Sequence, residues 1–159
     1  MNFEPDIIVS EEGSPRFRIA IEAKLSLDSL EQAESTLKRY MLGMGVPLGL
    51  IVSPGQLVIY RDSFASFSDD SVKRIGVFDI PRNLFPSNVD RPARRDTVPS
   101  SEQEFAFQRD VQTWLEEIAS THEIRDFSPD GREALTEHVL PALVGGVVRA
   151  AGPRELRAS

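Results

Sequence analysis

The sequence contains no cysteine and only two histidines in 159 residues, which restricts the metal centres that it can build. Without cysteine, disulfides and thiolate metal sites are excluded, and this absence fits a reducing cytosol. His122 and His138 lack partners at metal-ligand spacing, so we interpret both as structural residues. A metal site in this protein would therefore use oxygen ligands, which favour Mg²⁺, Mn²⁺ or Ca²⁺.

Long apolar segments are also absent from the sequence. No run approaches the ~18 residues that a membrane-spanning helix needs. The first residues, MNFEPD, lack the basic start and the apolar core of a signal peptide. We therefore expect a cytoplasmic protein without a membrane partner.

Basic residues are fewer than acidic ones, since 18 lysines and arginines against 25 aspartates and glutamates give a net charge of −7. Nucleic-acid binding usually rests on a basic surface, so this balance argues against broad contact with DNA. The acidic excess lies mainly in residues 101–159, which hold eleven acidic and six basic residues. We expect that region to face a protein. A local basic patch of Arg91, Arg94 and Arg95 is a candidate for nucleic-acid binding, unless these arginines only keep a linker soluble.

Hydrophobic periodicity predicts alternating strands and helices in the first half of the chain. Residues 16–25 alternate in polarity as a strand does, and 46–53 is nearly all apolar, as in a strand covered on both faces. Residues 28–44 carry one apolar stripe at helical spacing, with Asp28 as the expected N-cap. The predicted order is strand 5–10, strand 16–25, helix 28–44, and strands 46–53, 56–62 and 74–80.

A change in composition divides the chain. Residues 81–100 contain four prolines and four arginines without periodicity, so we expect a linker there. We therefore predict three parts, namely a nuclease-like α/β core at 1–80, the linker, and a C-terminal helical region at 101–159.

Two helices are expected in the C-terminal region. Ser101 and Glu104 have the spacing of a capping box, and an apolar stripe runs through residues 101–119. A second stripe covers residues 129–151, where Pro141 is expected to kink the helix. A helical pair of this kind could dock on a protein partner or form a homodimer.

Three charged residues interrupt the first two predicted strands: Asp6, Glu22 and Lys24. Glu22 and Lys24 are two residues apart, so they share one face of their strand. Converging carboxylates hold a hard cation, and a nearby lysine orients the attacking water and offsets charge during phosphodiester cleavage. From alternation alone, the same residues could instead be the solvated face of a β-hairpin.

The run Pro5-Asp6 … Glu22-Ala23-Lys24 resembles the motif of the PD-(D/E)xK nuclease superfamily. The segments that follow, a helix ending in LKRYM and then GVPLGLIVSPGQLVIYR, are similar to the nuclease domain of type I restriction-enzyme motor subunits. The resemblance covers residues 4–62. It implies a restriction-endonuclease-like α/β fold, with a mixed central sheet flanked by helices, here followed by a C-terminal helical pair.

The resemblance also implies a function and assigns roles to residues. It implies hydrolysis of DNA phosphodiester bonds that depends on Mg²⁺ (or Mn²⁺), in restriction, defence or repair. Asp6 and Glu22 would ligate the ion together with the carbonyl of Ala23, and Lys24 would position the attacking water. The alternative is a non-catalytic module of the same fold that binds a protein or a nucleic acid.

The chain departs from the family pattern in two places. Relatives use a glutamine on the following helix and a tyrosine four residues later, but here Thr36 takes the glutamine position. Tyr40 is present and Gln32 lies one turn earlier, so both are accessory candidates. The family fold also opens with a helix before the Asp strand, whereas this chain starts almost on that strand. We hypothesise that the helix at 101–119 packs in that place.

Three further residues are candidates for contacts near the site. Lys38 and Arg39 are expected to touch a nucleic-acid backbone, unless they are simply the exposed face of a helix. Glu4 lies close to Asp6 on the same strand face and is a candidate additional ligand.

Overall fold

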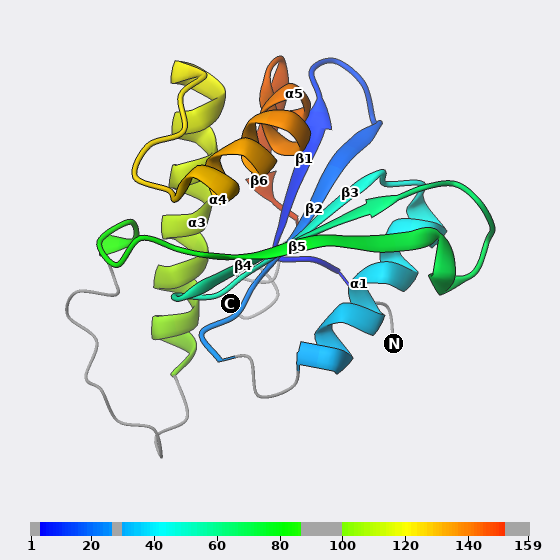
Figure 1. Ribbon diagram of the computed structural model, residues 1–159, viewed down its shortest axis with the longest axis horizontal. Helices are drawn as coiled ribbons and strands as arrows, with labels where there is room; N and C mark the ends of the chain where they lie inside the picture. The colour runs from blue at the N-terminus through cyan, green and yellow to red at the C-terminus, as the bar shows by residue number, and fades with distance from the viewer. Residues whose placement is uncertain (1–3, 27–29, 87–99, 152–159) are drawn as a thin grey trace.

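A six-stranded mixed β-sheet with helices on both faces forms the framework of the computed structural model (Figure 1). The structure describes residues 4–26, 30–86 and 100–151. In chain order its elements are β1 (Ile7–Glu11), β2 (Phe17–Ala23), α1 (Leu30–Met44), β3 (Leu48–Val52), β4 (Gln56–Asp62), η1 (Asp69–Ser71), β5 (Val72–Asp79), α3 (Ser101–Thr121), α4 (Pro129–Ala134), η2 (Leu135–Val139), α5 (Leu140–Leu143) and β6 (Gly146–Ala150). The predicted α/β class, with a mixed sheet flanked by helices, is confirmed.

The strand order across the sheet is β5-β4-β3-β2-β1-β6. β2 and β3 run parallel with α1 as the crossover between them, and the other neighbouring pairs are antiparallel. Parallel neighbours need such a crossover, whereas antiparallel neighbours can join through short turns. As a consequence, the ends of β2 and β3 lie at the same edge of the sheet as the start of β1, so residues next to these three termini come together.

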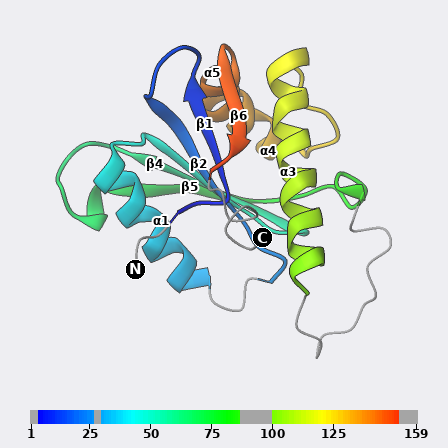
Figure 2. The same cartoon turned by 180° about the vertical axis from the view of Figure 1, so that it is seen from behind.

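The two faces of the sheet bury separate apolar clusters. On one face α1 packs Leu37 and Met41 against Ile51 of β3. On the other face α3 contributes Phe107 and Trp114 to a larger cluster with the remaining strand residues. Figure 2 shows α3 running beside β6 on this side. Because side chains alternate along a strand, both clusters are built from the same strands.

The prediction of a helix over residues 129–151 is wrong at its C-terminal end. The helical segment stops before Gly145, and β6 (Gly146–Ala150) pairs with β1. Gly145 adopts φ 75°, a left-handed conformation that ends the helix. The β-branched Val147 and Val148 then favour an extended chain. The C-terminal region is therefore not helical throughout, since it also supplies an edge strand of the sheet.

The predicted N-cap of α3 is displaced by one residue. The hydroxyl of Ser100, not of Ser101, accepts a hydrogen bond from the backbone N–H of Gln103 at 3.2 Å. The side chain of Gln103 accepts the Ser100 N–H at 2.8 Å in return. Both serines have Glu or Gln three residues later, so the spacing alone does not separate them. Asp28, the expected cap of α1, lies outside the described residues.

The predicted linker is described only at its two ends, because residues 87–99 lie outside the described part of the chain. At its near end Phe85 is fully buried, and its ring meets the rings of Phe107 and Trp114 edge-on, with centroids 5.3 and 5.8 Å away. The chain leaving β5 is therefore packed against α3. Among the described residues, the helices are too short or too polar to cross a membrane.

Candidate active site

Asp6 is held at the start of β1 by contacts with two other elements. Its side chain is only 6% exposed. One carboxylate oxygen accepts the backbone N–H of Ala23 at 2.9 Å, and the other accepts the side-chain amide of Gln108, on α3, at 3.1 Å. These two hydrogen bonds, from β2 and from α3, hold the Asp6 carboxylate in one orientation.

Glu22 lies in β2 and is 3% exposed. The register pairs Ile7 of β1 with Ile21 of β2, and Asp6, which directly precedes β1, donates its backbone N–H to the carbonyl of Ile21 at 3.0 Å. Asp6 and Glu22 are therefore close in backbone position at the paired ends of β1 and β2, and both side chains are buried.

Ala23 and Lys24 lie at the end of β2. Ala23 pairs with Val52 of the parallel strand β3, and the backbone N–H of Lys24 donates to the carbonyl of Val52 at 2.8 Å. The Lys24 side chain is half-buried and alternates onto the same side of the strand as Glu22. The backbone at this motif is thus fixed by β1 and β3 on its two sides.

The donor set fits a hard divalent cation such as Mg²⁺ that keeps part of its water shell. Among the described residues, no group of three or more His, Cys, Asp or Glu side chains could hold a metal ion. The candidate set is instead the carboxylate pair of Asp6 and Glu22. Mg²⁺ is commonly bound through one or two carboxylates together with waters and substrate phosphates, so a pair is sufficient for it.

The accessory candidates lie on or near α1. Burial raises the pKa of Tyr40, and the charge of Glu4 raises it further, so these two side chains are close to each other. Gln32 is exposed, and its backbone carbonyl accepts the hydroxyl of Thr36 at 2.8 Å. The structure therefore brings Glu4 to Tyr40, while Gln32 faces solvent in the first turn of the helix.

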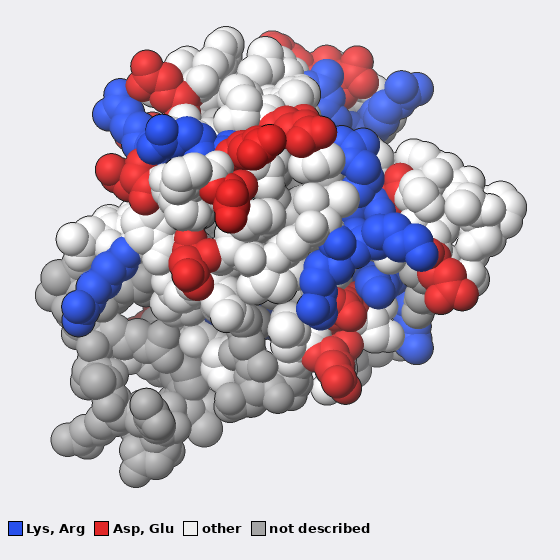
Figure 3. Space-filling model, in the orientation of Figure 1, with Lys and Arg blue, Asp and Glu red and all other residues white. Residues whose placement is uncertain are grey.

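Of the predicted nucleic-acid contacts, only Lys38 and Arg39 lie in the described part of the chain. Lys38 is half-buried and forms an ion pair with Glu34 at 3.7 Å, whereas Arg39 is exposed. The three linker arginines, Arg91, Arg94 and Arg95, lie outside the described residues. Arg61 of β4 pairs with Lys73 of β5, next to Arg74. Figure 3 shows a group of basic side chains on this face of the molecule.

A partly buried acid, Glu34 of α1, lies in a cluster with charged and polar partners. The hydroxyl of Tyr60 donates to Glu34 at 2.6 Å, and Arg74 forms a salt bridge with the same carboxylate. Burial raises the pKa of Tyr60 strongly, and the hydrogen bond to Glu34 adds to this effect. Burial also opposes ionisation of Glu34, but the hydrogen bonds from Tyr60 and Arg74 outweigh it and lower the pKa of Glu34. This cluster joins α1 to β4 and β5.

Sequence reasoning missed Gln108 and the cavity beside it. The cavity has a volume of about 610 Å³ and lies between α3 and the ends of β1 and β6, with Asp6 on its wall. Gln108 is 102 positions from Asp6 in the sequence, and a single glutamine on a helix carries no local signal. The one useful indication was the hypothesis that the helix at 101–119 packs beside the Asp6 strand. The structure does place α3 beside the Asp6 strand, as the replacement hypothesis requires.

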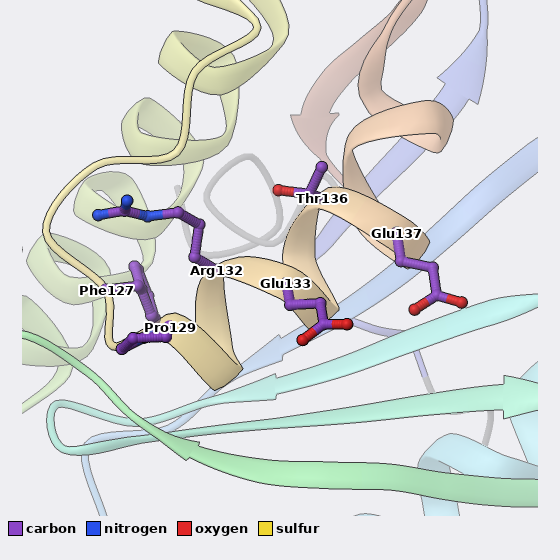
Figure 4. Close-up of a pocket in the computed structure, with 6 residues that line it drawn as sticks. All are labelled: Phe127, Pro129, Arg132, Glu133, Thr136 and Glu137. Carbon is purple, nitrogen blue, oxygen red and sulfur yellow. The ribbon is translucent and has the colours of Figure 1, made fainter.

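A separate cavity of about 600 Å³ lies over α4. Figure 4 shows Glu133 and Glu137 pointing from this helical segment toward the strands below, while Arg132 points the other way. Close by, the guanidinium of Arg61 donates to the imidazole of His138 at 3.3 Å. None of the residues lining this cavity lines the cavity beside Asp6, and its mixed charges give no reaction chemistry.

Comparisons with known proteins identify no relative. The chain matches no protein-family model, no curated protein and no solved structure. Functional inference therefore depends on the residues of the site itself.

Proposed function

We propose that this protein is a divalent-metal-dependent nuclease that hydrolyses phosphodiester bonds in DNA. The observation that carries the proposal is the burial of two acids, Asp6 and Glu22, at the ends of β1 and β2 where Ile7 pairs with Ile21. Lys24 follows on the same side of β2, so the three side chains have the composition that phosphodiester hydrolysis needs. A solvated hairpin face does not explain two acids that are less than a tenth exposed.

The chain path around these residues supports a restriction-endonuclease-like fold as part of the proposal. The Asp strand pairs antiparallel with the Glu-x-Lys strand, a helix follows, and the next strand runs parallel to the second and turns back as a hairpin. This is the order that the resemblance to PD-(D/E)xK nucleases implies. α3 would replace the opening helix of that fold, since it reaches Asp6 through Gln108.

Asp6 and Glu22 would hold the cation, and the carbonyl of Ala23 stays a predicted third ligand. When bound, Mg²⁺ or Mn²⁺ would polarise the phosphate and lower the pKa of an attacking water. Lys24 would orient that water with its ammonium group and offset the charge that develops on the phosphate. The Ala23 N–H and the Gln108 amide hold the Asp6 carboxylate in one orientation, which reduces the cost of organising the site.

A non-catalytic binding module of the same fold is the second candidate. It is favoured by two exposed aromatic side chains in the loop between β4 and β5, Phe64 at 66% and Phe67 at 100% exposure. Exposed aromatic residues are enriched at protein interfaces, so this loop suits a protein partner. Dimerisation through the C-terminal helices and a cytoplasmic location stay predictions.

Cleavage of supercoiled plasmid and of single-stranded DNA, in Mg²⁺ or Mn²⁺, separates the two candidates. We expect the wild type to cut, and Asp6→Asn and Lys24→Ala to lose at least about 100-fold in rate. Lys73→Ala is the matched control, because Lys73 is an exposed lysine on β5 and should leave the rate unchanged. A wild type that cuts neither substrate with either ion would favour the binding module. Cutting that survives Asp6→Asn would disprove the assigned site.

A further inference from the structure

The cavity beside Asp6 is lined mainly by one face of α3. Phe105, Gln108, Arg109 and Gln112 line it, and they recur at the spacing of residues that share one side of a helix. Its volume of about 610 Å³ lies within the range of small-ligand sites. The opposite wall includes Asp6 and Ile7, so the cavity reaches the candidate active site directly.

The side chains on this wall match the chemistry of a nucleotide. Phe105 is 41% exposed and presents an aromatic surface on which a base can stack. Gln112 is half-buried and carries an amide that can both donate to and accept from a base edge. Arg109 is exposed and carries a guanidinium, which binds phosphate with paired hydrogen bonds.

We propose that this cavity binds one unstacked nucleotide of a single DNA strand, next to the scissile phosphate at the proposed metal site of Asp6 and Glu22. The inference rests on the proposed nuclease function and names its substrate as single-stranded rather than duplex DNA. The base stacks on Phe105 and forms hydrogen bonds with Gln112, and the phosphate backbone binds Arg109. Glu102 also lines the cavity and repels phosphate, so the backbone lies on the Arg109 side.

Duplex DNA cannot place a base in this cavity. In a duplex each base face is covered by its neighbours, so a base reaches a side-chain ring only when it is flipped out or already single-stranded. Stacking on Phe105 therefore selects a strand with free base faces, and it is tolerant of sequence because every base has such a face. The substrate preference follows from the cavity walls and not from the metal.

Binding of short fluorescent oligonucleotides, measured by anisotropy in Ca²⁺ with the full chain, tests this site without requiring cleavage. Phe105→Ala should weaken single-strand binding by about 5- to 100-fold and leave duplex binding unchanged. Arg109→Gln should weaken it at low salt and reduce the slope of log affinity against log salt by about 1. Phe67→Ala and Arg132→Gln are the matched controls, an exposed phenylalanine and an exposed helical arginine away from this cavity.

The outcomes separate this inference from the nuclease proposal. Equal single-strand affinity of wild type and Phe105→Ala overturns the cavity assignment, while plasmid cleavage still tests Asp6 and Lys24. Equal loss of single-strand and duplex affinity also overturns it, because the effect would then not be base stacking. Phe105 is partly exposed, so its replacement should leave the unfolding temperature near the wild-type value, and that temperature is measured for each variant.

Discussion

Glu34 and Asp6 are both held where a helix meets the sheet, but different donors hold them. Glu34, on the α1 side, accepts hydrogen bonds from Tyr60 and Arg74 and lies near Lys38. Asp6, on the α3 side, accepts hydrogen bonds from a backbone N–H and a glutamine amide. Cationic donors neutralise an acid and stabilise the fold, whereas neutral donors orient an acid without neutralising it. We infer a structural role for Glu34, and the cation-binding role of Asp6 and Glu22 stays a proposal that the substitutions below test.

Replacing Glu22 by glutamine should have the largest effect and tests this comparison most directly. Glu22→Gln keeps the shape of the side chain and removes its charge, so DNA cleavage should fall by more than about 100-fold. Stability should not fall, because the change removes the cost of keeping a charged carboxylate at a position that is only 3% exposed. Plasmid-cleavage rates and urea unfolding of the same preparation measure both quantities.

The matched variant for Glu22→Gln is Glu34→Gln, the same change at the partly buried glutamate of α1. It should leave cleavage close to the wild-type rate. A Glu22→Gln protein that cuts normally but unfolds more easily would show that Glu22 is a structural acid, and the comparison between the two sites would fail.

Removing the Gln108 amide should have an intermediate effect. Gln108→Met keeps the length and volume of the side chain but cannot donate to Asp6, so the carboxylate loses one of its two described hydrogen bonds. Groups that orient a metal ligand typically contribute about 10–100-fold to metal affinity. Calorimetric titration with Mn²⁺ measures this without DNA. Gln112→Met, one turn further along α3, should bind Mn²⁺ as the wild type does, and equal affinity of both variants would contradict a positioning role for Gln108.

Local patterns were sufficient to predict most of the sheet. The predicted strands over 5–10, 16–25, 46–53, 56–62 and 74–80 agree with β1 to β5 to within two residues at each end. Alternation, an apolar run and turn residues act over a few positions, so a single sequence contains them. β6 was missed because its partner, β1, lies far away in the sequence, and because two glycines next to valines fit a weakened helix as well as a strand.

In the same way, some residues of the candidate site could be predicted from local sequence, and others depend on contacts between distant parts of the chain. Asp6, Glu22 and Lys24 stand in a short motif, and the pairing of β1 with β2 brings the strand ends that carry the two acids together. Gln108 and Phe105 reach the same place only because α3 packs across the sheet, which depends on the complete apolar cluster on that face. No spacing rule connects residues that meet through tertiary packing, so these two could not be predicted.

The smallest expected effect is the stability change in Glu34→Gln, and its sign depends on pH. At neutral pH we expect a loss of about 1 kcal/mol, at the low end for a hydrogen bond to a charged group, because Arg74 is 44% exposed and partly screened. The folded state lowers the pKa of Glu34, so ionised Glu34 stabilises the protein above the ordinary glutamate pKa of about 4.3.

That stabilisation is lost as the pH falls through the lowered pKa of Glu34 in the folded state, where the carboxylate becomes protonated. The unfolding free energies of wild type and Glu34→Gln should therefore converge in acid and separate toward neutral pH. Urea unfolding at a series of pH values measures this difference. A difference that is constant across the acid range would mean that hydrogen-bond geometry, and not the charge of Glu34, holds α1 to β4 and β5. The contrast between a neutralised acid and an oriented acid would then need another explanation.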